Sequence, residues 1–294
     1  MSTKELYEEV TSSIIEKIRA GVDSCEWVRP WATGSMMPHN VASNKHYRGV
    51  NVLLLWDAAA RKGYEGPSVW GTYKQWAEKG GQVQKGEKAT TILFWKPFEK
   101  ENKLTGKVDR FAMARTFRVF HVSQQEGYTL PIVEDAPTAL RVERAEAFFG
   151  AVGADWSDKD PTRAYYSSVA DKINVPNISQ FVDAERYYAT VAHEHGHWTG
   201  HESRLDRDLA NKFGSAAYAG EELVAEMSAA FTCATLGLRT FEREDHAQYL
   251  QSWLQVIASD PSALVHAASQ AAKATDWLVY MAAKGSSVEV ETAA

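Results

Sequence analysis

Residues 184–198 read AERYYATVAHEHGHW and hold His193, Glu194 and His197 in the spacing HExxH. Apolar residues recur through this stretch at helical intervals, so we predict a helix over about residues 183–200. Side chains four residues apart lie on one face of a helix, which lets the imidazoles of His193 and His197 converge on one metal ion. Glu194 stands beside them as the general base of a metal-assisted amide hydrolysis, in which zinc lowers the pKa of a bound water.

A catalytic zinc site needs a third protein ligand and an open fourth position. The longer pattern HExxHxxGxxH is not completed, because Ser203 occupies the place of its third histidine. His201 is also unsuitable, since three histidines along one straight helix face span too great a length to reach one ion. The run EELVAE on the next predicted helix is the better source. We expect Glu222 to bind the metal and Glu226 to orient a ligand histidine, and the exchange of these two roles stays open.

An amide hydrolase also needs a hydrogen-bond donor for the oxyanion that forms, usually a Tyr or a His. The sequence does not choose among the candidates, each of which is more typical of packing than of catalysis: Tyr187, Tyr188, Tyr218 and His201. We therefore assign the role of oxyanion stabiliser to none of them at this point.

The C-terminal half is mainly helical in pattern. We predict one helix that ends near Gly153, two short strands at 163–169 and 172–175, and further helices at 220–236, 241–258 and 261–283. The last ten residues, from Gly285, are expected to form a frayed tail.

The N-terminal half mixes helices and strands. Helices are predicted from Ser2 to about residue 20, from 51 to 62, and in a short segment capped by Thr72 and Gln75. The stretches 90–95 and 111–122 are rich in β-branched and aromatic residues, with a turn-like ENKLTG sequence between them, which indicates two antiparallel strands. The chain as a whole is therefore expected to be α+β.

The sequence TLPIVEDAP at 129–137 contains two prolines and marks a predicted boundary between domains 1–130 and 131–294. The formal net charge of -6 divides unevenly across this boundary. Residues 27–128 hold 16 basic and 8 acidic side chains, a balance of +8, whereas residues 131–294 carry a balance of -11. A basic half beside an acidic half suggests two bodies with different partners.

Cations and aromatic residues are interleaved in the basic half, which holds six of the ten tryptophans. Single-stranded nucleic acid is bound by cations that contact phosphates and by aromatic rings on which bases stack. We therefore expect single-stranded DNA to bind there without sequence preference, with double-stranded DNA as a further partner. The candidate contacts are Lys45, Arg48, Trp70, Lys74, Trp95, Lys96, Arg115 and Arg118.

The two cysteines, Cys25 and Cys233, form no CxxC pair, which excludes both a disulfide framework and a thiolate zinc site. The N-terminus resembles no secretory leader, and no long apolar run predicts a membrane span. The sequence therefore favours a cytoplasmic protein with no membrane partner.

The run from Ala184 to Leu205, followed by YAGEELVAE at 218–226, resembles the ArdC family of plasmid antirestriction proteins. Upstream, YRGVN at 47–51 and the segment 70–86 resemble the N-terminal domain of that family, which also occurs in some plasmid primases. The resemblance implies an N-terminal domain that binds single-stranded DNA and a C-terminal zincin-like metallopeptidase domain. It further implies that incoming conjugative DNA is shielded from host restriction enzymes.

The metal-binding positions of that family correspond to His193, His197 and one glutamate of the 222/226 pair, and its catalytic carboxylate corresponds to Glu194. His195 stands where many relatives are expected to have an aliphatic residue, and we expect it to face away from the metal. The implied cofactor is zinc or another divalent transition metal. Two alternatives are a zinc-dependent, gluzincin-like peptidase whose basic domain captures a protein substrate, and a non-enzymatic binder with a vestigial site.

Overall fold

The computed structural model describes residues 5, 7, 8, 11, 12, 14–16, 36–64, 66–101, 108–130, 138–209, 216–238 and 247–292. The chain divides into two compact units. The N-terminal unit comprises Met1–Val10 and Pro38–Pro131, and the C-terminal unit comprises Thr11–Met37 and Ile132–Ala294. The division into domains 1–130 and 131–294 stays a prediction. Of the helix expected near the N-terminus, the described residues between 5 and 16 are helical.

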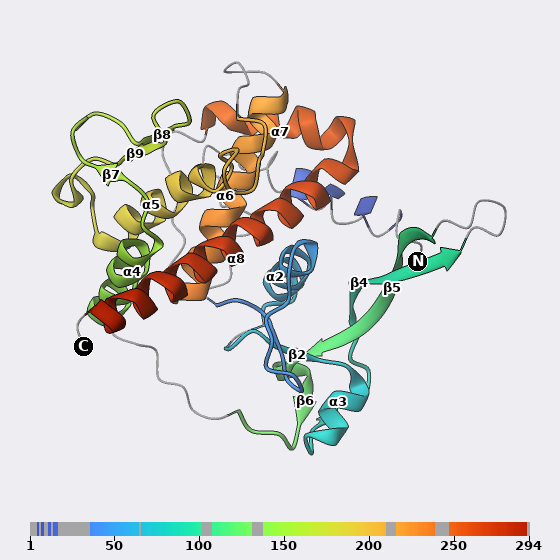
Figure 1. Ribbon diagram of the computed structural model, residues 1–294. Helices are drawn as coiled ribbons and strands as arrows, with labels where there is room; N and C mark the ends of the chain where they lie inside the picture. The colour runs from blue at the N-terminus through green and yellow to red at the C-terminus, as the bar shows by residue number, and fades with distance from the viewer. Residues whose placement is uncertain are drawn as a thin grey trace. The chain divides into compact units, whose positions relative to one another are not determined.

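The N-terminal unit is built on a four-stranded sheet with the order β1-β2-β5-β4 (Figure 1). Its strands are β1 (His39–Asn40), β2 (Val69–Gly71), β4 (Thr90–Glu101) and β5 (Val108–His121). β1 and β2 are parallel, and the other two pairs are antiparallel. A second, two-stranded sheet pairs β3 (Gln82–Val83) with β6 (Gln125–Glu126), which follows the 3-10 turn η1 (Val122–Gln124).

Two helices accompany these sheets, and each has one boundary where the sequence predicts it. Helix α2 (Val50–Lys62) stops at Gly63, which has a φ of 62° and donates its N–H to carbonyls of the last turn. Helix α3 (Tyr73–Glu78) begins with the predicted capping box between Thr72 and Gln75. α2 also reaches strand β4 through Asn51, whose side-chain amide exchanges two hydrogen bonds of 2.6 and 2.8 Å with the backbone of Leu93.

Strands β4 and β5 form a ladder that runs from the pair Thr90–Val119 to the pair Glu101–Val108. At the inner end, Ile92 and Val119 are buried in a cluster with Leu55 and Trp70. From Phe94 outward the described side chains are exposed, and the two strands continue as a ribbon (Figure 1). Both predicted strands are confirmed and are longer than expected, whereas most of the predicted turn lies outside the described residues.

In the part of the C-terminal unit that the structure describes after residue 137, α4 is followed by four further α-helices. This part consists of α4 (Thr138–Val152), β7 (Trp156–Ser157), β8 (Tyr165–Ser167), β9 (Lys172–Asn174), η2 (Ile178–Gln180), α5 (Ala184–Trp198), α6 (Ala216–Leu236), α7 (Ala247–Ser259) and α8 (Pro261–Thr292). The small sheet has the order β7-β9-β8, with β7 parallel to β9 and β8 antiparallel to it. An apolar core of this unit joins α4, α5, α6 and α8 around Phe149, Val191 and Leu278. The predicted α+β class, with a helical C-terminal half and a small sheet, is confirmed.

The expected frayed tail is wrong for the described residues, because α8 continues to Thr292. Gly285, where the sequence predicts that the frayed tail begins, lies inside this helix. A methyl group added there would collide with the carbonyl oxygen of Ala151 and lie 2.9 Å from its carbonyl carbon. The glycine therefore allows α8 to pass close to the end of α4, which is a packing role that sequence pattern does not show.

Within the described part of the chain, no helix is both long enough and apolar enough to cross a bilayer. The most apolar long helix, α6, is interrupted by Glu221, Glu222 and Glu226. Helices α5 and α6 pack against each other, and this contact carries the candidate site.

Candidate functional site

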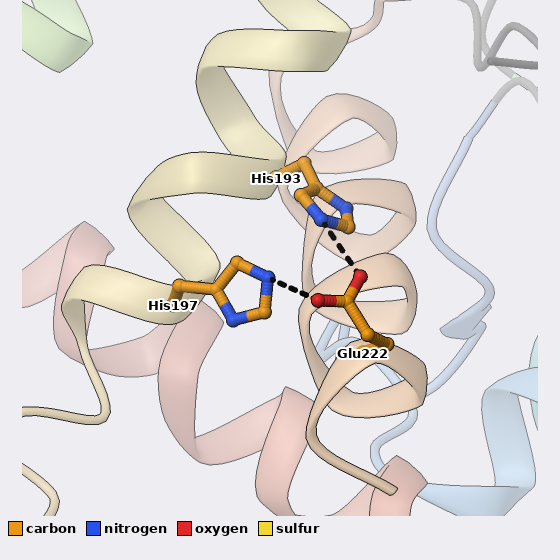
Figure 2. Close-up of side chains that lie close together, drawn as sticks. All are labelled: His193, His197 and Glu222. Carbon is orange, nitrogen blue, oxygen red and sulfur yellow. Dashed lines mark ion pairs between the residues drawn. The ribbon is translucent and has the colours of Figure 1, made fainter. Parts of the chain in front are cut away.

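Helix α5 places His193 and His197 one turn apart, and helix α6 places Glu222 opposite them (Figure 2). The Nε2 atom of His193 lies 3.6 Å from Glu222 Oε2, and the Nε2 atom of His197 lies 3.4 Å from Glu222 Oε1. One ligand atom from each of the three residues lies within 4.8 Å of the others, and all three side chains are largely shielded from solvent. Sequence spacing and structure thus bring the same three residues together.

A second carboxylate faces the other ring nitrogen of each histidine. Glu226 Oε2 lies 3.4 Å from His193 Nδ1, and Glu221 Oε1 lies 3.2 Å from His197 Nδ1. Metal-binding histidines commonly have such a partner, which fixes the ring orientation and makes the ligand nitrogen more basic. Glu226, which we expected to orient a ligand histidine, thus faces the ring nitrogen of His193 that is turned away from Glu222. The structure also gives Glu221 the same position on His197, a role that sequence reasoning missed although Glu221 is adjacent to Glu222.

The close approach of α5 and α6 depends on Gly196, which lies between the two histidines. A methyl group added at Gly196 would collide with Ser228 Oγ and lie 3.1 Å from the carbonyl oxygen of Ala225. Even alanine there would require the Ser228 side chain and the backbone of α6 at Ala225 to shift, so Gly196 permits the close packing that brings the histidines to Glu222. Sequence reasoning could not find this role, because Gly196 occupies a variable position of the HExxH spacing.

The charges of the cluster stabilise one another despite their burial. Burial alone would lower the pKa of His197, but the carboxylates of Glu222 and Glu221 outweigh it and raise that pKa well above its ordinary value. Burial alone would raise the pKa of Glu222, but His197 and His193 hold it below its ordinary value. Glu221 is likewise held ionised against the effect of burial, by the hydrogen bond from Arg207 and then by His197.

The donor set fits a divalent transition metal. Two imidazoles and a carboxylate are ligands that zinc and its neighbours accept, and the buried carboxylates favour a cation between them. Without a metal ion, a proton on His197 is the cation that the carboxylates stabilise, so binding of a metal must displace it. The residues present therefore suit a metal that binds more tightly as the pH rises.

Glu194 is 3 % exposed and belongs to the same helix turn as His193. His195, by contrast, points into the apolar core. Its Nδ1 donates to the carbonyl of Val191 at 2.8 Å, and its ring packs against Phe149 and Trp156. Burial lowers the pKa of His195 to about 4, so the ring is neutral at physiological pH. This placement agrees with the expectation that His195 faces away from the metal.

Two of the oxyanion candidates serve packing. Tyr188 is buried and stacks on Phe149, and Tyr187 packs edge-on against Phe181. His201 bonds the hydroxyl of Ser203 through its Nδ1 atom. The structure gives none of these three residues a contact with the cluster of His193, His197 and Glu222.

Of the candidate nucleic-acid contacts, Trp95, Arg115 and Arg118 lie on the β4–β5 ribbon of the N-terminal unit. Phe94 is 55 % exposed, Trp95 46 % and Phe117 44 %, while Arg115 and Arg118 are also exposed. The register pairs Phe94 with Arg115, and the rings of Phe94 and Phe117 meet at right angles with centroids 6.0 Å apart. Because side chains alternate along a strand, these three share one face and Trp95 and Arg118 occupy the other.

Trp70 is a correction to the predicted interface. It is 0 % exposed, packs in the core with Leu55 and Val119, and donates its indole N–H to Ser68 Oγ at 3.0 Å. A ring enclosed on both faces offers no surface for a base, so Trp70 is part of the fold. Its position in the strand β2, buried along its whole length, explains the error.

The remaining predicted contacts lie apart from the ribbon faces. Lys45 and Arg48 are exposed between β1 and α2, and Lys74 is exposed on α3 with Glu78 3.6 Å away. Lys96 pairs with Met113 in the ladder, and its side chain lies outside the described residues. Sequence reasoning did not select Phe94 or Phe117, because it cannot tell where the ribbon leaves the core. It also did not select Tyr73, which is 54 % exposed on α3.

Two family models match the chain, one in each half. Residues 143–270 match the model of a zincin-like metallopeptidase family, and residues 4–120 match that of the N-terminal domain of anti-restriction factor ArdC. The fold and the site therefore define a zincin-like metallopeptidase domain joined to an ArdC-type N-terminal domain.

Individual relatives span nearly the whole chain. The uncharacterized protein y4eC of Sinorhizobium fredii is 42% identical over 284 residues, which cover 93% of this chain and 91% of that protein. The metal-free crystal structure of the antirestriction protein ArdC from plasmid R388 has a TM-score of 0.79 and 38% identity, and covers 95% of this chain and 98% of that one. Its Mn(II)-bound structure has a TM-score of 0.77. The chain belongs to the ArdC family of antirestriction proteins.

A DNA primase TraC of Escherichia coli is also similar, at 38% identity over 296 residues. The match covers 94% of this chain but 27% of the primase. The resemblance expected from the sequence, both to the antirestriction family and to plasmid primases, is thus confirmed.

Proposed function

We propose that this protein is an antirestriction factor that binds single-stranded DNA without sequence preference and protects incoming conjugative plasmid DNA from host restriction in the cytoplasm. Membership of the ArdC family supports the antirestriction role, and the donor set in the C-terminal unit of this chain supports a bound divalent metal. The DNA-binding part rests on the ribbon of β4 and β5, because each of its two faces exposes at least one aromatic ring and one arginine.

The ribbon suits an unpaired strand better than a duplex. Bases of single-stranded DNA expose their ring faces, on which Phe94, Phe117 and Trp95 can stack, and each stacked base contributes about 1–3 kcal/mol. Arg115 and Arg118 stand beside these rings and can contact the phosphates between successive bases. In a duplex the same bases are stacked on one another, so only the arginines would contribute.

The metal part of the proposal rests on His193, His197 and Glu222. A divalent cation held there supplies Lewis acidity and lowers the pKa of water, as zinc does in peptidases. Glu221 and Glu226 hold the two imidazoles in orientation, and Glu194 is assigned the proton transfer. The Mn(II)-bound ArdC structure supports a divalent metal without favouring zinc.

The DNA-binding proposal is tested by mobility shift of the full chain with a labelled oligothymidine and with a duplex of the same length. We expect the single strand to bind more tightly and its binding to weaken steeply with rising salt. The variant Trp95→Ala should weaken it, while Tyr280→Ala removes a similarly exposed aromatic residue from α8 and serves as the control. Equal binding by Trp95→Ala and the parent chain would remove the ribbon from the interface.

A second candidate function is a zinc-dependent peptidase whose basic unit captures an acidic protein substrate. The presence of Glu194 on the same helix as both histidines favours it, since a purely structural site needs no general base. A conjugation assay into a restricting host separates the two. If Glu194→Gln abolishes protection but retains metal and DNA binding, protection requires hydrolysis; if it protects fully, the metal supports the fold alone.

A further inference from the structure

We propose that Arg207 is a positioning residue that fixes the imidazole of His197 and thereby sets the metal affinity of the site. This inference rests on the proposed metal site and adds to it a residue from outside both helices. Arg207 belongs to the loop after α5, ten residues beyond His197, and neither the HExxH spacing nor the EELVAE run points to it.

The loop after α5 folds back on the end of that helix and places Arg207 beside it. Leu205 donates its N–H to the carbonyl of Thr199 at 3.1 Å, and Arg207 donates its N–H to the carbonyl of Gly200 at 2.9 Å. Gly200 leaves space for the guanidinium group, because an added methyl would lie 2.9 Å from Arg207 Nη2. Backbone hydrogen bonds and a small residue together position this one side chain.

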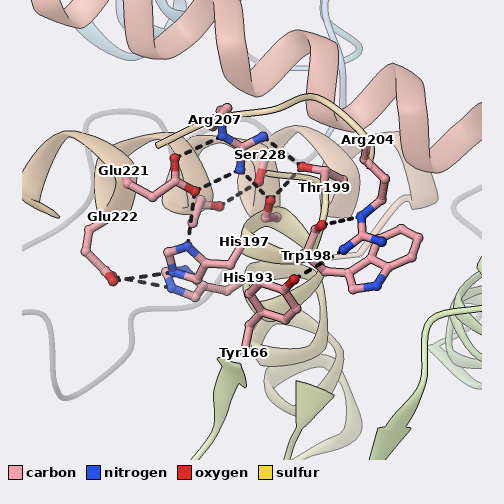
Figure 3. A network of polar contacts seen from close by, with 12 residues as sticks. Tyr166, His193, His197, Trp198, Thr199, Arg204, Arg207, Glu221, Glu222 and Ser228 are labelled. Carbon is pink, nitrogen blue, oxygen red and sulfur yellow. Dashed lines mark hydrogen bonds and ion pairs between the residues drawn. The ribbon is translucent and has the colours of Figure 1, made fainter. Parts of the chain in front are cut away.

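The guanidinium group of Arg207 joins α5, its following turn and α6 (Figure 3). Nη2 donates to the carbonyl of Gly196 at 2.7 Å, and Nη1 donates to Thr199 Oγ1 at 2.9 Å. Nε and Nη2 also donate to the two carboxylate oxygens of Glu221, at 2.9 and 2.8 Å. The side chain is only 7% exposed, so its planar set of donors is held in one geometry.

This arrangement acts on the metal ligands through Glu221. Arg207 donates hydrogen bonds to both oxygens of the Glu221 carboxylate, and this carboxylate faces His197 Nδ1 at 3.2 Å. Rotation of that imidazole would move its Nε2 atom away from Glu222, so fixing one ring nitrogen directs the other. Glu222 follows Glu221 on α6, and the contact of Arg207 with Gly196 lies next to His197 on α5. Arg207 therefore constrains both sides of the ligand set.

A cavity of about 870 Å³ is lined by Arg207, whereas His193, His197 and Glu222 are not among its lining residues. Arg207 and Glu221 line it together with Arg204, Leu223, His266 and Lys273. Arg204 offers a matched control, since it lines the same cavity and is also largely buried. Its guanidinium group contacts Asp171, Tyr166 and the ring of Trp198, and has no contact with Glu221 among those described.

The test measures the affinity of the full chain for Zn²⁺ and Mn²⁺ by chelator competition, and the absorption spectrum of the Co²⁺ form. We expect Arg207→Ala to weaken metal binding by about 10- to 100-fold, the usual effect of losing a partner of a ligand histidine. The Co²⁺ spectrum should change, because the imidazole is less constrained. Arg204→Ala should leave affinity and spectrum nearly unchanged. Arg207→Lys, with a single ammonium group, should fall between Arg207→Ala and the parent chain.

Chemical rescue separates positioning from general loss of structure. Ethylguanidinium at millimolar concentration can enter the cavity of Arg207→Ala and should recover at least part of the metal affinity, with no effect on the parent chain. If Arg207→Ala does not fold, Arg207→Lys carries the affinity and spectral measurements. If the parent chain binds metal and the Arg207 variant shows the same affinity and spectrum, the positioning role is overturned and the proposed metal site stands. Absence of metal binding by the folded parent chain overturns the proposed metal site as well.

Discussion

The metal cluster and the β4–β5 ribbon differ in how their side chains are held. In the C-terminal unit, both imidazoles of the cluster lie between carboxylates, and Glu222 faces them from within a helix pair. In the N-terminal unit, Phe94, Trp95 and Phe117 are exposed on two strands that extend beyond the core. A metal site requires fixed geometry before its ligand arrives, whereas stacking on a flexible strand tolerates many arrangements. Single substitutions should therefore act very differently in the two places.

The largest effect is expected from removing a ligand of the cluster. His193→Ala leaves Glu222 and His197 without the third donor, so elemental analysis of the purified chain should show loss of the metal. Glu194→Gln should retain the metal, since Glu194 is assigned to proton transfer. Full metal content in His193→Ala would show that the ion, if any, binds elsewhere. DNA binding should stay near that of the parent chain in both variants.

Gly196→Ala should break the helix contact that brings the ligands together. The added methyl collides with Ser228 Oγ, and we expect a loss of about 3 kcal/mol in the free energy of unfolding, measured by denaturant titration. Gly150→Ala is the matched control, because an added methyl meets nothing within 4 Å there and a helical glycine replaced by alanine is often stabilising. Equal stability of the two variants would contradict the close packing of α5 on α6.

The N-terminal unit should lose stability in acid through His121, which is 1% exposed and whose pKa burial lowers to about 4. In the unfolded chain this histidine has a pKa near 6.5, so the unfolded state binds the extra proton first. The contribution is present in full above about pH 6.5 and is lost as the pH falls towards 4. The loss amounts to at most about 3 kcal/mol. Thermal unfolding between pH 7 and 4 measures it, and the variant His121→Gln should show a smaller dependence on pH.

The smallest effects are expected on the ribbon. Phe94→Ala should weaken oligothymidine binding by about 1–3 kcal/mol without lowering stability, because the ring is exposed in the free protein. Arg115→Gln should reduce the slope of log affinity against log salt concentration by about one unit. Trp70→Ala should instead lower stability by several kcal/mol, as expected for a buried tryptophan. A ribbon variant that unfolds at lower temperature would contradict this separation.

Sequence predicted the parts of the molecule that depend on local spacing. HExxH placed His193 and His197 on one helix face, and the capping box at Thr72 was found as expected. Glu222 could be predicted because a catalytic metal site needs a third protein ligand and the next predicted helix contains few acidic residues. The roles of Arg207, Glu221 and Gly196 were not predictable, because each depends on how two helices and a loop meet in space.

Exposure was the other property that the sequence did not reveal. Trp70 and Trp95 both lie near basic and aromatic residues in the sequence, yet one is buried in the core and the other is exposed on the ribbon. The difference arises because β2 is covered along its length, while β4 and β5 extend past the cluster around Leu55. The prediction of a frayed tail from Gly285 failed for a related reason, since the close contact of this glycine with Ala151 is formed between helices far apart in sequence.

The hydrogen bonds between Asn51 and Leu93 bear on the solubility of the protein. β4 lies at the edge of its sheet, and an unpaired edge can recruit a strand of another molecule. The amide of Asn51 occupies both backbone groups of Leu93 and so blocks that edge at the base of the ribbon. A chain that exposes aromatic rings on this ribbon is therefore protected against strand pairing with another molecule at the base of the ribbon. Asn51→Leu should aggregate at concentrations where the parent chain stays monodisperse.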